Sequence, residues 1–233
     1  MRFHLLHTCL LAALAAAAGD GCATRPHIAQ CIVLPDDGRH GEAVRRAKQT
    51  IAHLFPAQYR ATQRAIITAA GKQFTCDGLL MVSPADGHHL ALVSSFGAVT
   101  DLRVRADDVT ELLKTTPLFQ ADWSRNFVAR DLRWLFIPPG ALQPAGRLAD
   151  GRLVLQTAPD AGGVAAKYVF SADGARWQEL FLAARGETFY RALARHYLKF
   201  PAMDSEMPDE LEVSAEAYQL ELRITALQPE GQL

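Results

Sequence analysis

The chain has 233 residues, a formal net charge of −1 and an apolar content of 49%. Its acidic and basic residues are interspersed, so the sequence lacks the basic patch that nucleic-acid binding requires. This length and apolar content favour one large domain with a substantial core over two small domains.

Residues 1–21 are predicted to be a signal peptide. Arg2 precedes an uncharged run, rich in Leu and Ala, from Leu5 to Ala18. This run is shorter than the roughly 20 apolar residues that a membrane-spanning helix needs, and a short apolar run behind a basic residue is typical of a secretory signal. The alternative is an Ala-rich helix that belongs to the fold.

Two cleavage sites compete at the end of this segment. Ala16-Ala17-Ala18 offers the small residues of an ordinary signal-peptidase site, whereas Gly19-Asp20-Gly21-Cys22 resembles the lipoprotein box of bacteria. We favour the second site, where Cys22 becomes the lipidated first residue and its acyl chains, such as palmitate, anchor the chain to a membrane. Ala23, rather than Asp, follows this cysteine. By the bacterial sorting pattern, this predicts the periplasmic side of the outer membrane.

The remaining cysteines predict a disulfide. If Cys22 is lipidated and Cys9 leaves with the signal, Cys31 and Cys76 remain as a pair in an oxidising compartment. The alternative is two unpaired buried thiols. No Cys-x-x-Cys or His-x-x-x-His spacing accompanies them, so we predict no metal site.

The first part of the mature chain is predicted to form a tether, a helix and several strands. Residues 22–40 contain Pro and Gly and are expected to form the tether. Apolar residues at helical spacing predict a helix of about 12 residues within 41–56, ended by Pro56. Alternating patterns from residue 58 to 107 then predict an antiparallel meander with turns at 70–72 and 84–87.

Two helices are expected to interrupt the strands. Residues 107–117 predict a short helix. Residues 121–140 predict a longer helix with a wide apolar stripe that includes Trp123 and Phe127, and with Asp131 and neighbouring arginines largely outside that stripe. The longer helix must cover something hydrophobic. It either roofs a cavity or packs on a filled core like any other helix.

Strands are expected to resume after residue 146. Their predicted segments are 151–158, 162–174, 175–187, 188–200, 211–213 after a loop, and 217–227. The total of about nine strands predicts an α+β fold, in which a curved antiparallel sheet forms a half-open β-barrel and helices cover its concave face. We expect a single domain over residues 41–227 and a tail over 228–233.

This organisation resembles the LolA/LolB lipoprotein-localisation family. The resemblance rests on Cys22 in its lipobox-like setting, the early helix, the meander, the insert ADWSRNFVARDLRWLFIPPG and the final strand AYQLELRITAL. It implies an incomplete barrel with a helical lid, whose cavity holds acyl chains. LolB has an exposed loop with a protruding Leu, and no equivalent is placed in this sequence.

The resemblance and the apolar pattern together give a set of candidate cavity residues. They are Phe74, Leu80, Leu92, Trp123, Phe127, Trp134, Leu135, Tyr168, Phe170, Trp177, Phe181 and Leu222. Ordinary core packing explains any one of them, so the sequence leaves open whether the core is hollow or filled.

No convincing catalytic set is present. The sequence has no Gly-x-Ser-x-Gly and no Gly-rich phosphate cradle, and His88-His89 lacks a metal-ligand spacing. We therefore expect no cofactor and no enzymatic activity. The predicted function is binding or transfer of a lipid, a lipoprotein or another hydrophobic ligand. The alternatives are a non-catalytic assembly component with an envelope protein as partner and, with less support, an esterase of envelope lipids.

Overall fold

The computed structural model describes residues 33, 41–84, 86–95, 97–105, 109–116, 121–201 and 206–229. The predicted signal peptide, the lipidation site Cys22 and the thiol of Cys31 lie outside these residues, and the expected domain boundaries stay predictions.

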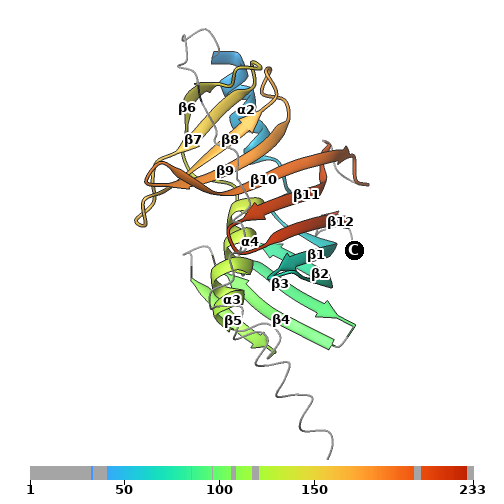
Figure 1. Cartoon of the computed structure of the whole chain (residues 1–233). Coiled ribbons are helices and arrows are strands. Elements are labelled where there is room, and N and C mark those ends of the chain that lie inside the picture. The colour runs from blue at the N-terminus through green and yellow to red at the C-terminus, as the bar shows by residue number, and fades with distance from the viewer. Residues whose placement is uncertain are drawn as a thin grey trace, which may run out of the picture.

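Twelve strands in the described residues form one sheet (Figure 1). The first five are β1 (Tyr59–Ala69), β2 (Lys72–Ser83), β3 (Gly87–Ser94), β4 (Gly97–Val104) and β5 (Thr110–Thr115). The other seven are β6 (Leu142–Arg147), β7 (Leu153–Thr157), β8 (Val164–Phe170), β9 (Trp177–Ala184), β10 (Glu187–Leu198), β11 (Met207–Ala215) and β12 (Gln219–Pro229).

The strand order explains why helices cover the sheet. It runs β5-β4-β3-β2-β1-β12-β11-β10-β9-β8-β7-β6, and all neighbouring pairs are antiparallel. Consecutive strands β5 and β6 therefore lie at opposite edges, and the chain between them must cross the whole sheet. It crosses on the apolar face as the helical segment α3 (Ala121–Trp123), η2 (Ser124–Val128) and α4 (Ala129–Phe136), which we call the lid. The open, one-sided sheet confirms the predicted fold class.

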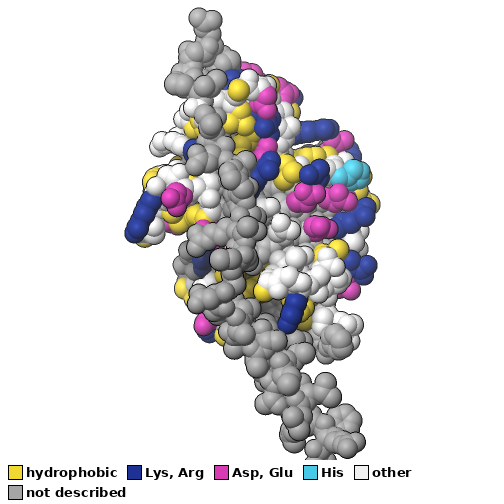
Figure 2. All heavy atoms as spheres, viewed as in Figure 1, with side chains coloured by type: hydrophobic (Ala, Val, Ile, Leu, Met, Phe, Trp, Pro, Cys, Tyr) yellow, Lys and Arg dark blue, Asp and Glu magenta, His cyan; other side chains and the backbone are white. Residues whose placement is uncertain are grey.

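The two faces of the sheet differ as the alternating sequence pattern predicts. On β2, Cys76, Gly78, Leu80 and Val82 are buried toward the helices, whereas the residues between them are more exposed. The outer face carries ion pairs between neighbouring strands, such as Arg64–Asp77 at 2.9 Å and Arg195–Glu212 at 2.7 Å. Figure 2 shows basic and acidic side chains interspersed on the visible surface.

Helix α2 (Gly41–Ala52) confirms the predicted early helix and covers the β7–β9 part of the apolar face. Ala47 and Ile51 are its buried residues. The helix reaches the sheet closely because the turn between β8 and β9 carries Gly174, where an added Cβ would lie 2.2 Å from the carbonyl oxygen of Ala43.

Three elements differ from the sequence prediction. Residues 110–115 form the edge strand β5 rather than a helix. Pairing with β4 supplies hydrogen bonds, whereas an isolated helix of this length is unstable. β6 was not expected, since Pro144 and Gly146 are typical of a loop, but an edge strand with a bulge accommodates both. β11 extends over Met207–Ala215 rather than 211–213.

Candidate ligand cavity

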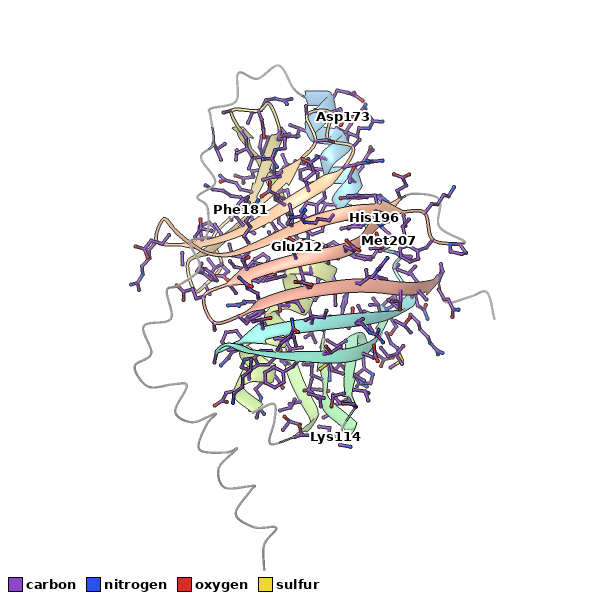
Figure 3. The ribbon with its side chains drawn as sticks, turned by 45° about the vertical axis from the view of Figure 1, so that its right-hand side comes forward. Lys114, Asp173, Phe181, His196, Met207 and Glu212 are labelled. Carbon is purple, nitrogen blue, oxygen red and sulfur yellow. The ribbon has the colours of Figure 1, made fainter. Side chains whose placement is uncertain are left out.

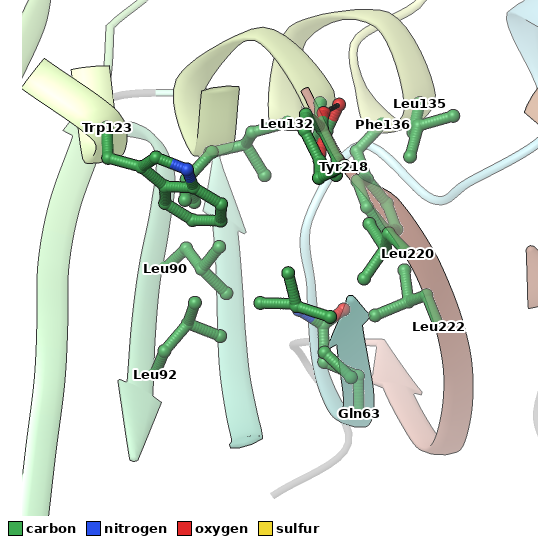
Figure 4. Close-up of a pocket in the computed structure, with 14 residues that line it drawn as sticks. Gln63, Leu90, Leu92, Trp123, Leu132, Leu135, Phe136, Tyr218, Leu220 and Leu222 are labelled. Atoms are coloured by element: carbon green, nitrogen blue, oxygen red, sulfur yellow. Dashed lines mark hydrogen bonds between the residues drawn. The ribbon is translucent and has the colours of Figure 1, made fainter. Parts of the chain in front are cut away.

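An apolar cavity of about 40 Å³ lies between the lid and the centre of the sheet (Figure 4). The sheet contributes residues of β1, β3 and β12, namely Gln63, Ala65, Ile67, Leu90, Leu92, Leu220 and Leu222, with Tyr218 just before β12. The lid contributes Trp123, Val128, Asp131, Leu132, Leu135 and Phe136. This volume has room for about three water molecules, or a few methylene groups.

The lid forms one wall of the cavity and contains a π-helical turn. The π-helix η2 has more residues per turn than an α-helix. The residues after Val128 are therefore rotated relative to a continuous α-helix. Asp131 is buried together with Leu132 and Leu135 of α4, although the sequence prediction placed it largely outside the apolar stripe. The lid ends at Phe136, where Ile137 adopts extended backbone angles before Pro138.

Asp131 is the centre of a polar cluster beside the cavity. Tyr218 Oη donates a hydrogen bond of 2.5 Å to Asp131 Oδ1, and Arg130 Nη2 donates to Tyr218 Oη at 3.3 Å. The Arg130 guanidinium also lies 5.2 Å from the ring centroids of both Phe127 and Tyr190. Burial raises the pKa of Asp131 to about 6, against the opposing effects of Tyr218 and Arg130. The same burial, with the nearby carboxylate, raises the pKa of Tyr218.

Further polar contacts connect the lid to strands at the β5 side of the sheet. Thr100 on β4 donates a buried hydrogen bond of 3.0 Å to Ser124, and Arg133 donates to Thr110 Oγ1 at 2.8 Å. His88 on β3 hydrogen-bonds the backbone of Phe136, while burial lowers the pKa of its ring. The lid is thus attached through individual side chains rather than through a backbone ladder.

Four of the candidate cavity residues line this cavity, namely Leu92, Trp123, Leu135 and Leu222. Trp134, Tyr168 and Trp177 line a second space of about 10 Å³ near α2, which Leu135 also borders. Leu80 and Phe170 are fully buried in the core. Phe127 packs at the cavity's edge, 5.6 Å from the Trp123 ring and 5.4 Å from the Tyr218 ring. Phe74 is half-buried and pairs with Ile67.

Phe181 was predicted to line the cavity, but it faces away from the lid (Figure 3). It forms a separate small cluster with Val154 and Val169, and Val33 packs against this cluster. The Arg191 guanidinium lies 5.6 Å from the Phe181 ring and also bonds Glu179 on the same face. The aromatic side chain of Phe181 indicated burial, but it did not indicate which face of β9 the residue lies on.

Cys76 is buried with a free thiol, and burial raises its pKa. Because Cys31 is outside the described residues, the disulfide between them stays a prediction. No group of three potential metal ligands occurs in the residues that the structure describes. None of the helices among them has the length and apolar content needed to cross a bilayer.

Gln63 is one of the cavity residues that sequence reasoning missed, and with Asp131 it is a polar one. It lies on the inward face of β1 with Tyr59, Ala61, Ala65 and Ile67, and is 5% exposed. The available signal was a polar residue at an apolar position of an otherwise regular alternation.

Solved structures show the same fold. A LolA superfamily protein from Nitrosomonas europaea is 8% identical, with a TM-score of 0.55, covering 87% of this chain and 96% of that one. A DUF1329 family protein from Desulfovibrio piger is 10% identical, with a TM-score of 0.52 and coverage of 82% and 95%. A proposed outer membrane lipoprotein-sorting protein domain from Vibrio parahaemolyticus is 12% identical, with a TM-score of 0.51 and coverage of 82% and 94%.

No family model and no curated protein matches the sequence. The structural likeness nevertheless confirms the LolA-like fold that the order of elements predicts.

Proposed function

We propose that this protein binds and carries a lipid, the acyl part of a lipoprotein or another amphiphile between the lid and the sheet, without chemical turnover. The observation that carries the proposal is the apolar cavity beneath a lid attached by individual side chains. Two similar structures bear the names LolA superfamily and lipoprotein sorting, which supports a role of this kind in the bacterial envelope.

The proposed anchor is a lipid on Cys22, which holds the domain on the periplasmic side of the outer membrane. Mass spectrometry of the mature protein from a bacterial host tests this part directly. Cys22→Ser is expected to abolish acylation and release the protein from the membrane fraction. A mature N-terminus at Gly19, without lipid, would instead establish ordinary signal-peptidase cleavage.

Ligand binding is tested by exposing delipidated protein to a total membrane lipid extract, followed by native mass spectrometry. We expect retention of acyl material, because burial of apolar surface contributes about 25 cal/mol per Å². A protein that recovers no acyl material would contradict the proposal.

Two matched variants locate the binding. Ala65 and Ala61 are both buried on the inward face of β1, but only Ala65 lines the cavity. Ala65→Leu adds three carbon atoms to the cavity and should reduce lipid retention, whereas Ala61→Leu adds the same atoms elsewhere and should leave retention unchanged. Circular dichroism checks that both variants fold. Equal retention by the two variants would place the ligand outside this cavity.

A further inference from the structure

The polar side chain of Gln63 lies in the apolar cavity without a hydrogen-bond partner for its oxygen. Gln63 is 5% exposed, and its Oε1 is buried and unpaired. Among the described residues that line the cavity, it is the one with such an orphan atom. Figure 4 shows Gln63 extending from β1 toward the lid, with Leu92 on one side and Leu222 on the other.

The neighbouring backbone accommodates this side chain closely. Gly78 pairs with Gln63 across β1 and β2, and an added Cβ at Gly78 would lie 2.8 Å from Gln63 Cγ and 3.0 Å from its Nε2. A residue other than glycine would displace the carboxamide. A buried carbonyl oxygen without a partner is destabilising, so this group is unfavourable for packing alone.

The second polar side chain on the cavity wall restricts the charge of a ligand. Asp131 on the lid is a hydrogen-bond acceptor when ionised, and its Oδ1 is already bound by Tyr218. A carboxylate head group placed in the same apolar space would face this second buried acid, which disfavours it. Gln63 Oε1 and the ionised Asp131 are both acceptors and therefore favour a donor. Arg130, the cation of this cluster, is hydrogen-bonded to Tyr218 and is not among the residues that line the cavity.

We propose, as an extension of the proposed function, that this cavity selects an uncharged amphiphile whose polar group carries an N–H or O–H, with Gln63 Oε1 as the acceptor. The alkyl chain occupies the Leu-rich wall, and the donor satisfies the orphan oxygen. Chains that lack a donor leave Gln63 desolvated and bind more weakly.

Titration calorimetry with matched dodecyl probes tests this selection. N-methyldodecanamide has an amide N–H, N,N-dimethyldodecanamide has none, dodecanol has an O–H, and dodecanoate at pH 8 is anionic. We expect the first probe to bind about tenfold more tightly than the second, since one buried acceptor is either satisfied or left unpaired. Dodecanoate should bind more weakly than either neutral donor.

The residue assignment is tested with two glutamines. Gln63→Met keeps the size of the side chain without the acceptor, and should reduce the preference between the two amides to within about twofold. Gln178 also has a buried, unpaired Oε1, but does not line the cavity. Gln178→Met should therefore retain the tenfold preference. A preference that survives in Gln63→Met would overturn the assignment.

The remaining outcomes separate this inference from the proposed function. Equal binding of the two amides and of dodecanol by the wild-type protein would overturn the selection but leave lipid binding intact. Failure of all four probes to bind would overturn both. Preference for N-methyldodecanamide identifies N-acyl compounds as the source of the donor, and preference for dodecanol identifies hydroxylated lipids. Either result supports the proposal.

Discussion

Asp131 couples the stability of the folded protein to pH. Its side chain is buried beneath the lid, and burial raises its pKa from 3.8 to about 6. The folded state therefore holds this proton more tightly than the unfolded state. The resulting stabilisation is fully present below pH 4 and is lost as the pH rises through 6. The loss amounts to on the order of 2–3 kcal/mol.

Asp131→Asn removes this dependence while keeping an oxygen that accepts from Tyr218. Urea unfolding should show that the free energy of unfolding of the variant, relative to that of the wild type, increases by on the order of 2–3 kcal/mol between pH 4 and pH 7.5. Asp122→Asn, an exposed position on the same lid, controls for the loss of one carboxylate. If the free energy of unfolding of the wild type instead increases relative to that of Asp131→Asn over this range, Tyr218 and Arg130 stabilise the ionised carboxylate.

Single residues also mark where sequence reasoning reached its limit at the candidate site. Leu92, Trp123, Leu135 and Leu222 could be predicted because large apolar residues at regular spacing must be buried. The burial of Asp131 was predicted wrongly. Its charge favoured an exposed position, although its spacing of four residues from both Phe127 and Leu135 places it on the apolar stripe.

At the level of elements, the docking of α2 depends on one glycine. Gly174 has a φ of +76°, accepts a 2.9 Å hydrogen bond from Thr50 and lies against the first turn of α2. Gly174→Ala introduces both a strained φ and a clash with helix backbone, and should cost about 2–4 kcal/mol.

Gly186 provides the matched control for that substitution. It has a similar φ of +85°, but nothing lies within 4 Å of an added Cβ. Gly186→Ala should therefore cost only about 1 kcal/mol in urea unfolding, the price of the backbone conformation alone. Equal costs for the two variants would mean that α2 shifts away freely and that its packing against the turn contributes little.

The same scale shows how far strands follow from sequence. The regular alternation of β1 to β4 and of β12 reflects one buried and one solvated face, so these strands were predictable. The edge strands β5 and β6 form their hydrogen bonds with β4 and β7, respectively. In β6, Pro144 also interrupts the sequence pattern of a strand. Whether such a segment forms an edge strand depends on pairing with a neighbouring strand, and the local sequence pattern does not indicate that pairing.

For the whole molecule, the strand order places the lid across the sheet, so we predict that loading of the proposed ligand depends on lid movement. The space between the lid and the sheet is narrow, with a cavity volume of about 40 Å³, so we expect it to widen when a dodecyl chain binds. Under the proposed function, we expect loading to separate the lid from the strands and to break the buried hydrogen bond between Thr100 and Ser124. The covalent replacement of this contact should block uptake.

Two cysteine pairs at matched positions test this dependence in a background with Cys76→Ala and the other native cysteines replaced by serine. Thr100→Cys with Ser124→Cys joins the lid to β4, where the two hydroxyl oxygens lie 3.0 Å apart. Thr62→Cys with Thr225→Cys joins β1 to β12 at the same 3.0 Å separation, away from the lid. Oxidation of the first pair should abolish uptake of N-methyldodecanamide, and reduction should restore it. The second pair should load equally in both states. Undiminished uptake by the oxidised first pair would show that ligands enter without lid movement.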